Sequence, residues 1–441
     1  MKRIYVIKRD GRKVLFDHMK IVDAILAAFR ELDGEESEYA LIKAGNIADY
    51  IAEYAEGAKH ELTIEEIQDL VEHGLMSLKR KDVARAYISY RDERTKARNR
   101  NSKLNKTIRE KITASNPKNQ NANVDEHSFG GRLGEANSAY MKEYALNECL
   151  SPKAKYNHIN NIIYTHDLDH YAVGDHNCLS IPFDDLLANG FNVRQTDVRP
   201  ANSVNTAFQL VAVIFQVQSL QQFGGVSATH LDWTMVPYVR KSFYKHYRDG
   251  MKYFCNCPDW SLKDILEDDE RYNDIIEISI TDYEYYMNEY DDSGDFDKVY
   301  QYAMDMTIKE VHQAVEGMYH NLNTLQSRSG NQLPFTSINY GTCTLPEGRM
   351  VIKALLETSL EGLGKLHKTS IFPCGIFQYM KGVNDKPGTP NYDLKLLALQ
   401  STAKRLYPNY ANVDWSGNKG YDRNDPKTYF STMGKCKLQL I

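Results

Sequence analysis

The chain has 441 residues, of which 42% are hydrophobic and 26% are charged, as in an ordinary soluble globular protein. Its 54 Lys and Arg against 59 Asp and Glu give a net charge of −5, which argues against a surface devoted to nucleic acid. The longest strongly apolar stretch, around 210–215, is much shorter than the roughly 20 residues of a membrane span. The first ten residues lack the apolar segment of a secretory signal. We therefore expect a cytoplasmic protein of two or three domains, without a nucleic-acid or membrane partner.

The cysteines are odd in number and widely spread, which does not predict a disulfide framework. They are Cys149, Cys178, Cys255, Cys257, Cys343, Cys374 and Cys436. Cys255 and Cys257, with His246 nearby, suggest a metal site, but a structural zinc site needs a second ligand pair that the sequence lacks. We therefore interpret this pair as structural and predict no metal site.

The first hundred residues predict a small, mostly helical domain with a β-hairpin at its start. Residues 4–14 form two short strands around a turn at 9–12, where Gly11 supplies a positive φ. Apolar residues then recur at helical spacing in four segments. The first helix has Asp17 as its expected N-cap, and the third opens with the capping box Thr63–Glu66.

From about residue 120 onwards, helical segments alternate with short apolar runs, which predicts an α/β architecture. The expected helices are Gly134–Ala145, Ser203–Phe223, Pro237–Phe254, Lys298–Leu325, Arg349–Gly362 and Tyr392–Leu406. The expected strands are Phe335–Tyr340 and Ser370–Tyr379.

The predicted hairpin carries a cluster of cations, including Lys8 and Arg9, with Lys20 on the helix that follows. Converging cations and exposed backbone N–H groups suit a polyphosphate. The chain contains no Walker-type G-x-x-x-x-G-K-[ST] motif. On the residues alone, a solvated hairpin is therefore the favoured interpretation.

Three stretches within this region resemble one regulatory domain, the ATP-cone of ribonucleotide reductases. They are Val6-Ile-Lys-Arg-Asp-Gly11, Phe16-Asp-His-Met-Lys20-Ile-Val-Asp-Ala-Ile25 and Tyr87-Ile-Ser-Tyr-Arg91. The resemblance covers residues 1–95 and implies that ATP and dATP bind here as allosteric on and off signals. It implies nucleotide contacts at the matching residues Lys8, Arg9, Gly11 and Lys20.

A second set of motifs, spread over the rest of the chain, resembles the anaerobic ribonucleoside-triphosphate reductases, which are glycyl-radical enzymes. The motifs lie at 121–132, 166–179, 222–228, 326–330, 337–342 and 371–377. The resemblance implies that residues 96–441 form an incomplete ten-stranded α/β barrel of the glycyl-radical type. It further implies a ribonucleoside triphosphate substrate, a homodimer, a radical-SAM activating enzyme, and formate or a thioredoxin-like protein as reductant.

The resemblance also gives roles to individual residues. Cys374, at an expected loop tip, becomes the thiyl cysteine that abstracts the 3′ hydrogen of the ribose. Cys178 becomes the second active-site cysteine, which delivers hydrogen to C2′ as water leaves. Without the surrounding motifs, both would be interpreted as core cysteines. Asn391 is placed where aerobic relatives carry a glutamate.

Polar residues near these cysteines are expected to line the substrate pocket. The substrate-contact candidates are Gln326, Ser329, Asn339 and His176. The spacing of His166, His170 and His176 also permits a metal cluster, although pocket lining is the favoured interpretation. A deoxynucleotide specificity effector is expected between two subunits, near the helix 203–223.

The sequence departs from the family after Gly434, where the relatives continue with Cys-Arg and a long remainder. Here residues 435–441 follow, and the chain contains no glycyl-radical motif. The resemblance places the glycyl radical and a four-cysteine zinc site in the missing part, and Cys436 is expected to have no function. Two hypotheses remain: an anaerobic reductase, or a truncated nucleotide-binding fragment without catalytic activity. A diiron-dependent aerobic subunit is disfavoured by the cysteine contexts.

Overall fold

The computed structural model describes residues 4–433, except for 10, 36, 101–102, 114–126, 175, 177, 194, 223, 262–273, 284–294, 328–330, 416–419 and 430. Ser329, Cys436 and the motif residues 121–126 lie outside these described residues. The chain forms two compact units, Met1–Thr107 and Ile108–Ile441. The predicted division between residues 95 and 96 falls within a helix of the smaller unit, Lys81–Arg100.

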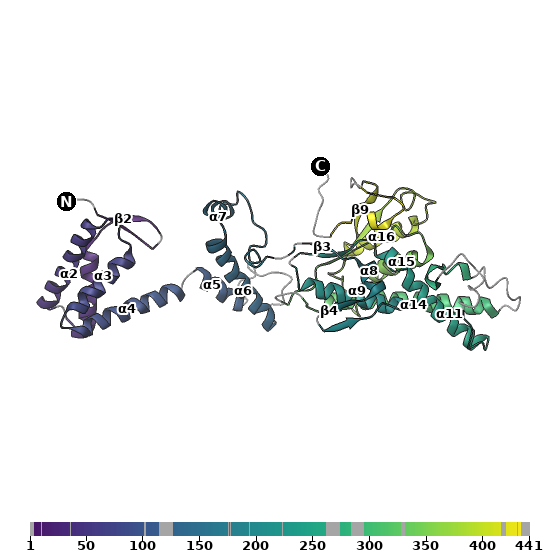
Figure 1. The fold of residues 1–441 in the computed structure, drawn as a ribbon, viewed down its shortest axis with the longest axis horizontal. Helices are drawn as coiled ribbons and strands as arrows, with labels where there is room; N and C mark the ends of the chain where they lie inside the picture. The colour runs from purple at the N-terminus through teal and green to yellow at the C-terminus, as the bar shows by residue number, and fades with distance from the viewer. Residues whose placement is uncertain are drawn as a thin grey trace. The chain divides into compact units, whose positions relative to one another are not determined.

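The smaller unit is a hairpin followed by four helices (Figure 1). Its elements are β1 (Tyr5–Ile7), β2 (Lys13–Leu15), α1 (His18–Asp33), α2 (Glu38–Gly57), α3 (Ile64–Ser77) and α4 (Lys81–Arg100). The strands are antiparallel, and the apolar faces of the helices share one core with Val6. The predicted helical domain with an N-terminal hairpin is thus confirmed.

Of the two helix caps expected in this unit, one is present and the other lacks its hydrogen bond. The capping box at the start of α3 is present, because Thr63 and Glu66 satisfy each other's backbone N–H groups. Asp17 is the N-cap residue of α1, but its side chain makes no capping hydrogen bond. The Asp17 carboxylate instead lies 3.3 Å from the Lys20 ammonium group.

The larger unit contains helices and short strands in alternation. Its helices are α6 (Phe129–Tyr144), α7 (Pro152–Ile159), α8 (Phe183–Asn189), α9 (Val204–Ser219), α10 (Leu231–Thr234), α11 (Val236–Phe254), α14 (Asp295–Thr324), α15 (Pro346–Glu361) and α16 (Tyr392–Arg405), with α5 (Lys103–Thr113) at the junction of the units. Its strands are β3 (Leu179–Ser180), β4 (Phe191–Val193), β5 (Thr196–Val198), β6 (Val226–Ala228), β7 (Thr336–Tyr340), β8 (Cys374–Tyr379) and β9 (Asn409–Asn412). None of the helices in the described ranges combines the length and apolar composition that crossing a membrane requires.

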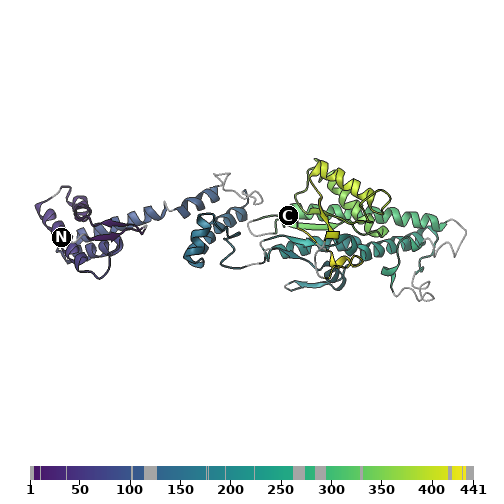
Figure 2. The same cartoon turned by 90° about the horizontal axis from the view of Figure 1, so that it is seen from above.

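Five of these strands form one parallel sheet in the order β3-β6-β7-β8-β9. The main apolar core joins residues of these strands to residues of α9, α14 and α15. The long helices α11 and α14 run side by side (Figures 1 and 2). The predicted α/β architecture is confirmed, whereas the implied ten-stranded barrel stays a prediction.

Several predicted elements differ from the structure at their ends, and the helix expected over 134–145 begins already at Phe129. The strand expected over 370–379 begins only at Cys374, because the preceding Pro373 has no N–H group for the ladder. The helix expected over 203–223 ends at Ser219, where the N–H of Leu220 turns back to the carbonyl of Val217.

A buried carboxylate fixes the loop that follows β7. Asp232 of α10 is fully buried, and its Oδ2 accepts the backbone N–H groups of Gly341, Thr342 and Cys343 at 2.9, 3.0 and 2.9 Å. Burial raises the pKa of Asp232, although these N–H groups oppose the shift. Its Oδ1 has no hydrogen-bond partner among the described residues.

We predict that Asp232→Ala lowers the free energy of unfolding by about 3 kcal/mol, because three buried N–H groups lose their acceptor. Asp232→Asn should cost less than Asp232→Ala, since its amide oxygen still accepts the three N–H groups. Denaturant unfolding of both variants measures the difference. Equal losses would show that the three hydrogen bonds do not stabilise the loop.

Candidate functional site

The hairpin of the smaller unit holds three of the four predicted nucleotide contacts at its tip. Gly11 has a φ of +79°, and its N–H group donates to the carbonyl of Lys8 at 2.8 Å. Arg9 lies in the same turn, whereas Lys20 lies in the first turn of α1. The N–H group of Ile7 donates to the carbonyl of Leu62 at 2.9 Å, which ties the hairpin to the start of α3.

Acidic residues of α3 hold Arg9 in place. Arg9 forms an ion pair with Glu65, and one of its NH₂ groups donates to Gln68 at 2.9 Å. Glu65 also accepts from Arg91 of α4 at 2.9 Å. The hydrogen bond from Arg9 is the largest of the effects that hold the pKa of Glu65 below its usual value. Arg9, a predicted nucleotide-binding residue, is therefore already paired with a carboxylate in this structure.

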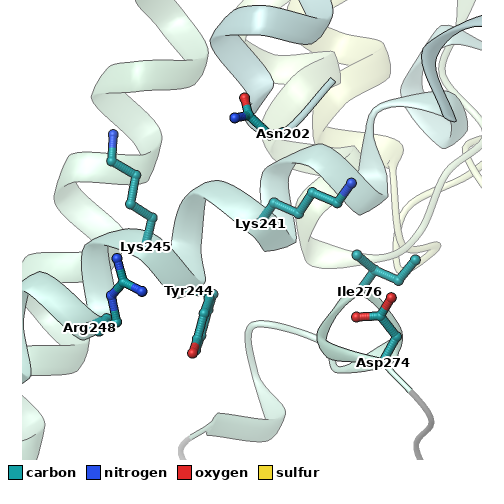
Figure 3. A pocket seen from close by; sticks show the side chains of 7 residues that line it. All are labelled: Asn202, Lys241, Tyr244, Lys245, Arg248, Asp274 and Ile276. Atoms are coloured by element: carbon teal, nitrogen blue, oxygen red, sulfur yellow. The ribbon is translucent and has the colours of Figure 1, made fainter. Parts of the chain in front are cut away.

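A cavity of about 320 Å³ lies along α11 in the larger unit, and we call it the α11 cavity (Figure 3). Four of its lining residues follow one another at helical spacing on α11, which places them on one face. Three of these four are cations, and one carboxylate, that of Asp274, also lines the cavity. The lining residues are Asn202, Lys241, Tyr244, Lys245, Arg248, Asp274 and Ile276.

A second cavity, of about 400 Å³, lies at the carboxyl ends of β3 and β6. At its centre, Asp184 accepts hydrogen bonds from His230 at 2.8 Å and Thr234 at 2.6 Å. Lys427 lies 3.8 Å from the same carboxylate. Burial opposes ionisation of Asp184, but the bonds from His230 and Thr234 outweigh it and lower the pKa. The carboxylate is thus already satisfied by the protein.

Cys374 is the first residue of β8, and it is not at the expected loop tip. It pairs with Ser337 of β7, and its side chain is buried with 7% exposure. Its thiol lies 3.4 Å from the phenol oxygen of Tyr407. The loop interpretation failed because the strand starts directly after Pro373. Cys374 lines neither of the two cavities described above.

Cys178 lies directly before β3 and is half-buried. The strand register aligns Leu179 with Val226, Val226 with Thr336, and Ser337 with Cys374. Both predicted catalytic cysteines therefore lie at the amino end of the same sheet. Three strand spacings of about 4.8 Å separate β3 from β8. The two cysteines therefore share the amino-terminal end of the sheet but are not in contact.

Asn391 lies at the other end of the sheet. Its side chain is fully buried and donates to the carbonyls of Gly341 at 3.1 Å and Cys343 at 2.8 Å, after the carboxyl end of β7. It also accepts a hydrogen bond from Arg349 at 2.7 Å. The structure thus gives Asn391 a role in holding this loop, and its catalytic role stays a prediction.

The remaining substrate-contact candidates are placed differently from one another. Asn339 is buried between β6 and the C-terminal segment, and its amide group exchanges hydrogen bonds with the backbone of Thr432 at 3.1 and 3.2 Å. Gln326 is exposed shortly after α14, and His176 is exposed and bridges to Gln222. Asn339 lies on β7 two residues from Ser337, the residue that pairs with Cys374, and His176 lies two residues before Cys178 in the chain.

The two suggested metal clusters can also be located. Within the described ranges, no three His, Cys, Asp or Glu side chains are placed to hold a metal ion. His246, considered with Cys255 and Cys257, instead lies 2.7 Å from the carboxylate of Glu310. Sequence reasoning missed the α11 cavity, although the helical spacing of its three cations was a usable signal.

Comparison with known proteins identifies both units. The model of the "ATP cone domain" matches residues 4–96, and the model "Anaerobic ribonucleoside-triphosphate reductase" matches residues 120–441, more than half of the chain. The chain belongs to the anaerobic ribonucleoside-triphosphate reductase family.

Curated members of this family match along almost the whole chain. The chain is 30% identical to the anaerobic ribonucleoside-triphosphate reductase of Escherichia coli over 93% of its length and 51% of that protein. It is also 30% identical to that of Haemophilus influenzae, over 94% of the chain and 53% of the relative. The chain thus spans about half the length of these relatives. A crystal structure of the Thermotoga maritima anaerobic ribonucleotide reductase, with dATP in its specificity site, superposes with a TM-score of 0.42 at 13% identity, covering 69% of this chain and 46% of that one.

Proposed function

We propose that this chain carries out anaerobic reduction of ribonucleoside triphosphates, under allosteric control by nucleotides bound at two sites. The observation that supports this proposal most directly is the order of the two family matches: an ATP-cone precedes the reductase unit in one chain. The first site is the hairpin tip of the ATP-cone, for ATP and dATP. The second is the α11 cavity, for a deoxynucleoside triphosphate effector.

The α11 cavity suits a nucleoside triphosphate because of its charge and its aromatic ring. Lys241, Lys245 and Arg248 supply three positive charges, which a triphosphate needs, and Asp274 supplies one negative charge. The ring of Tyr244 offers a flat surface on which a base stacks. The effector was expected near the helix 203–223, whereas the cavity lies mainly on the next helix, α11, and only its lining residue Asn202 is beside that segment.

For the reaction itself, the proposal keeps the two predicted cysteines. A thiyl radical at Cys374 would abstract the 3′ hydrogen of the ribose, and Cys178 would deliver hydrogen to C2′ as the 2′ hydroxyl leaves as water. The two electrons of the reduction would come from formate or a thioredoxin-like protein. The position of both cysteines at the amino-terminal end of the strands supports a shared catalytic role. The contact of Cys374 with Tyr407 instead favours a structural role for Cys374.

The proposal further includes a homodimer in the cytoplasm and a radical-SAM enzyme that generates a glycyl radical, which would store the oxidising equivalent for the cysteine. The 441 residues contain no glycyl-radical motif, so the proposal requires the glycine to come from outside them. The described residues contain no ligand set for a zinc ion, so no step is assigned to one.

Arg9→Ala should weaken ATP binding to the ATP-cone by about tenfold or more, because a charge-assisted bond to phosphate is lost. Glu65→Gln should strengthen ATP binding several-fold, because Arg9 no longer has to leave a carboxylate. Glu61→Gln is the matched control, since Glu61 pairs with Lys13 at 2.7 Å and not with Arg9. Calorimetric titration with ATP measures all three. Equal effects of Glu65→Gln and Glu61→Gln would exclude direct competition for Arg9.

Lys245→Ala should weaken dATP binding at the α11 cavity by about tenfold, since one of three cations is lost. The variant is made in the Arg9→Ala background, so that binding at the ATP-cone does not mask the change. Lys252→Ala is the control, because Lys252 lies on the same helix over the ring of Tyr253, outside the cavity lining. If the two lysine variants bind dATP alike, the cavity is not the effector site.

The reductase activity is tested anaerobically with the purified chain, a radical-SAM activating enzyme, ATP, CTP and formate. Formation of dCTP with a glycyl radical signal supports the enzyme. ATP binding without either product favours the fragment without catalytic activity. If dCTP forms, Cys178→Ser and Cys374→Ser should both abolish it, whereas Cys149→Ser, at an exposed position, should not. Retained activity in Cys374→Ser would place the thiyl radical on another cysteine.

A further inference from the structure

The turn that ends α11 carries two cysteines, Cys255 and Cys257, that the proposed reaction does not use. The backbone N–H groups of both residues donate to the same carbonyl, that of Met251, at 3.2 and 3.1 Å. Asn256 between them adopts a left-handed conformation with a φ of 53°. The two cysteines therefore flank a tight, hydrogen-bonded turn.

The thiol of Cys257 lies close to the backbone of Cys255. The Sγ of Cys257 lies 3.3 Å from the backbone carbonyl oxygen of Cys255. Consecutive Cα atoms are about 3.8 Å apart, so Cα atoms two residues apart are separated by at most about 7.6 Å, and the turn at Asn256 shortens this distance. Disulfides form across Cα separations of about 4.4–6.8 Å. The geometry of the turn is therefore compatible with a bond between the two sulfurs.

The surroundings fit thiol chemistry better than metal binding. Cys257 is exposed to solvent, and Cys255 is half-buried against the aromatic core around Tyr247. His246, the nearby histidine, is paired with Glu310. One accessible thiol beside a more protected one is the usual arrangement of an attacking and a resolving cysteine.

We propose that Cys255 and Cys257 form a reversible disulfide that acts as a redox switch at the end of the helix lining the α11 cavity. The thiolate of Cys257 attacks a low-molecular-weight disulfide, forms a mixed disulfide and releases one thiolate. The thiolate of Cys255 then attacks the sulfur of Cys257 and releases the second thiolate. Two protein thiols are oxidised to one disulfide, and one small disulfide is reduced to two thiols.

The turn is connected to the cavity through neighbouring aromatic rings that are tilted relative to one another. The backbone N–H group of Trp260 donates to the carbonyl of Cys257 at 3.4 Å. The centre of the Trp260 ring lies 5.1 Å from that of Tyr247 and 6.2 Å from that of Tyr244. Tyr244 lines the cavity. Closing the disulfide changes the backbone that holds Trp260 and, through it, the ring of Tyr244. This coupling rests on the proposed effector function of the cavity, whereas formation of the disulfide does not.

The disulfide is tested on the whole chain in buffers of increasing ratio of oxidised to reduced glutathione. After acid quenching, mass spectrometry of the peptide containing both cysteines should show the loss of two hydrogens, reversed by dithiothreitol. Cys255→Ser and Cys257→Ser should each abolish this species. Cys149, an exposed cysteine elsewhere in the chain, is the internal control and should form only a mixed disulfide with glutathione.

Two outcomes would overturn the disulfide. In one, Cys257 of the unaltered chain accumulates as a mixed disulfide with glutathione, as it should in Cys255→Ser. In the other, both thiols remain reduced at ratios that modify Cys149. The coupling has its own readout: oxidation should change dATP affinity at least threefold in the Arg9→Ala background, but not when Cys257→Ser is added. Unchanged affinity in the oxidised chain would refute the coupling.

Discussion

The carboxylate of Asp232 determines where the second half of the parallel sheet lies. It collects three consecutive backbone N–H groups after β7. The carbonyl of Gly341, in the same loop, accepts from Asn384 at 3.0 Å and from Asn391 at 3.1 Å. Three side chains from separate parts of the chain thus converge on one turn. Without them, the connection from β7 to α15 would bury unpaired backbone groups, which is costly in a core.

The two proposed nucleotide sites differ in how their positive charges are balanced. At the ATP-cone, Arg9 is neutralised by Glu65, so a triphosphate has to displace an existing ion pair. The α11 cavity is lined by three cations and one carboxylate, so a triphosphate would meet an excess of positive charge. The first site therefore exchanges one anion for another, whereas the second adds an anion where charge is unbalanced.

Local patterns predicted the helices well, because their apolar spacing is contained in the sequence of each segment. The capping box at Thr63 and the helix at 392–405 are examples. The strands were harder to predict, since β3 has two residues and β6 has three, too few to show a period. The contacts of Asp232 and Asn391 join residues far apart in the chain, and no local pattern predicts them. The expected role of Asn391 rested on resemblance alone, and its buried hydrogen bonds became visible only in the fold.

Glu65 is shared by two guanidinium groups on different elements, Arg9 on the hairpin and Arg91 on α4. The backbone bond between Ile7 and Leu62 keeps the hairpin attached to α3 even when Arg9 turns away. At the proposed site, an anion bound by Arg9 would leave Glu65 to Arg91 alone and would thereby tighten the contact between α3 and α4. Occupancy of the hairpin would then stiffen the last helix of the ATP-cone.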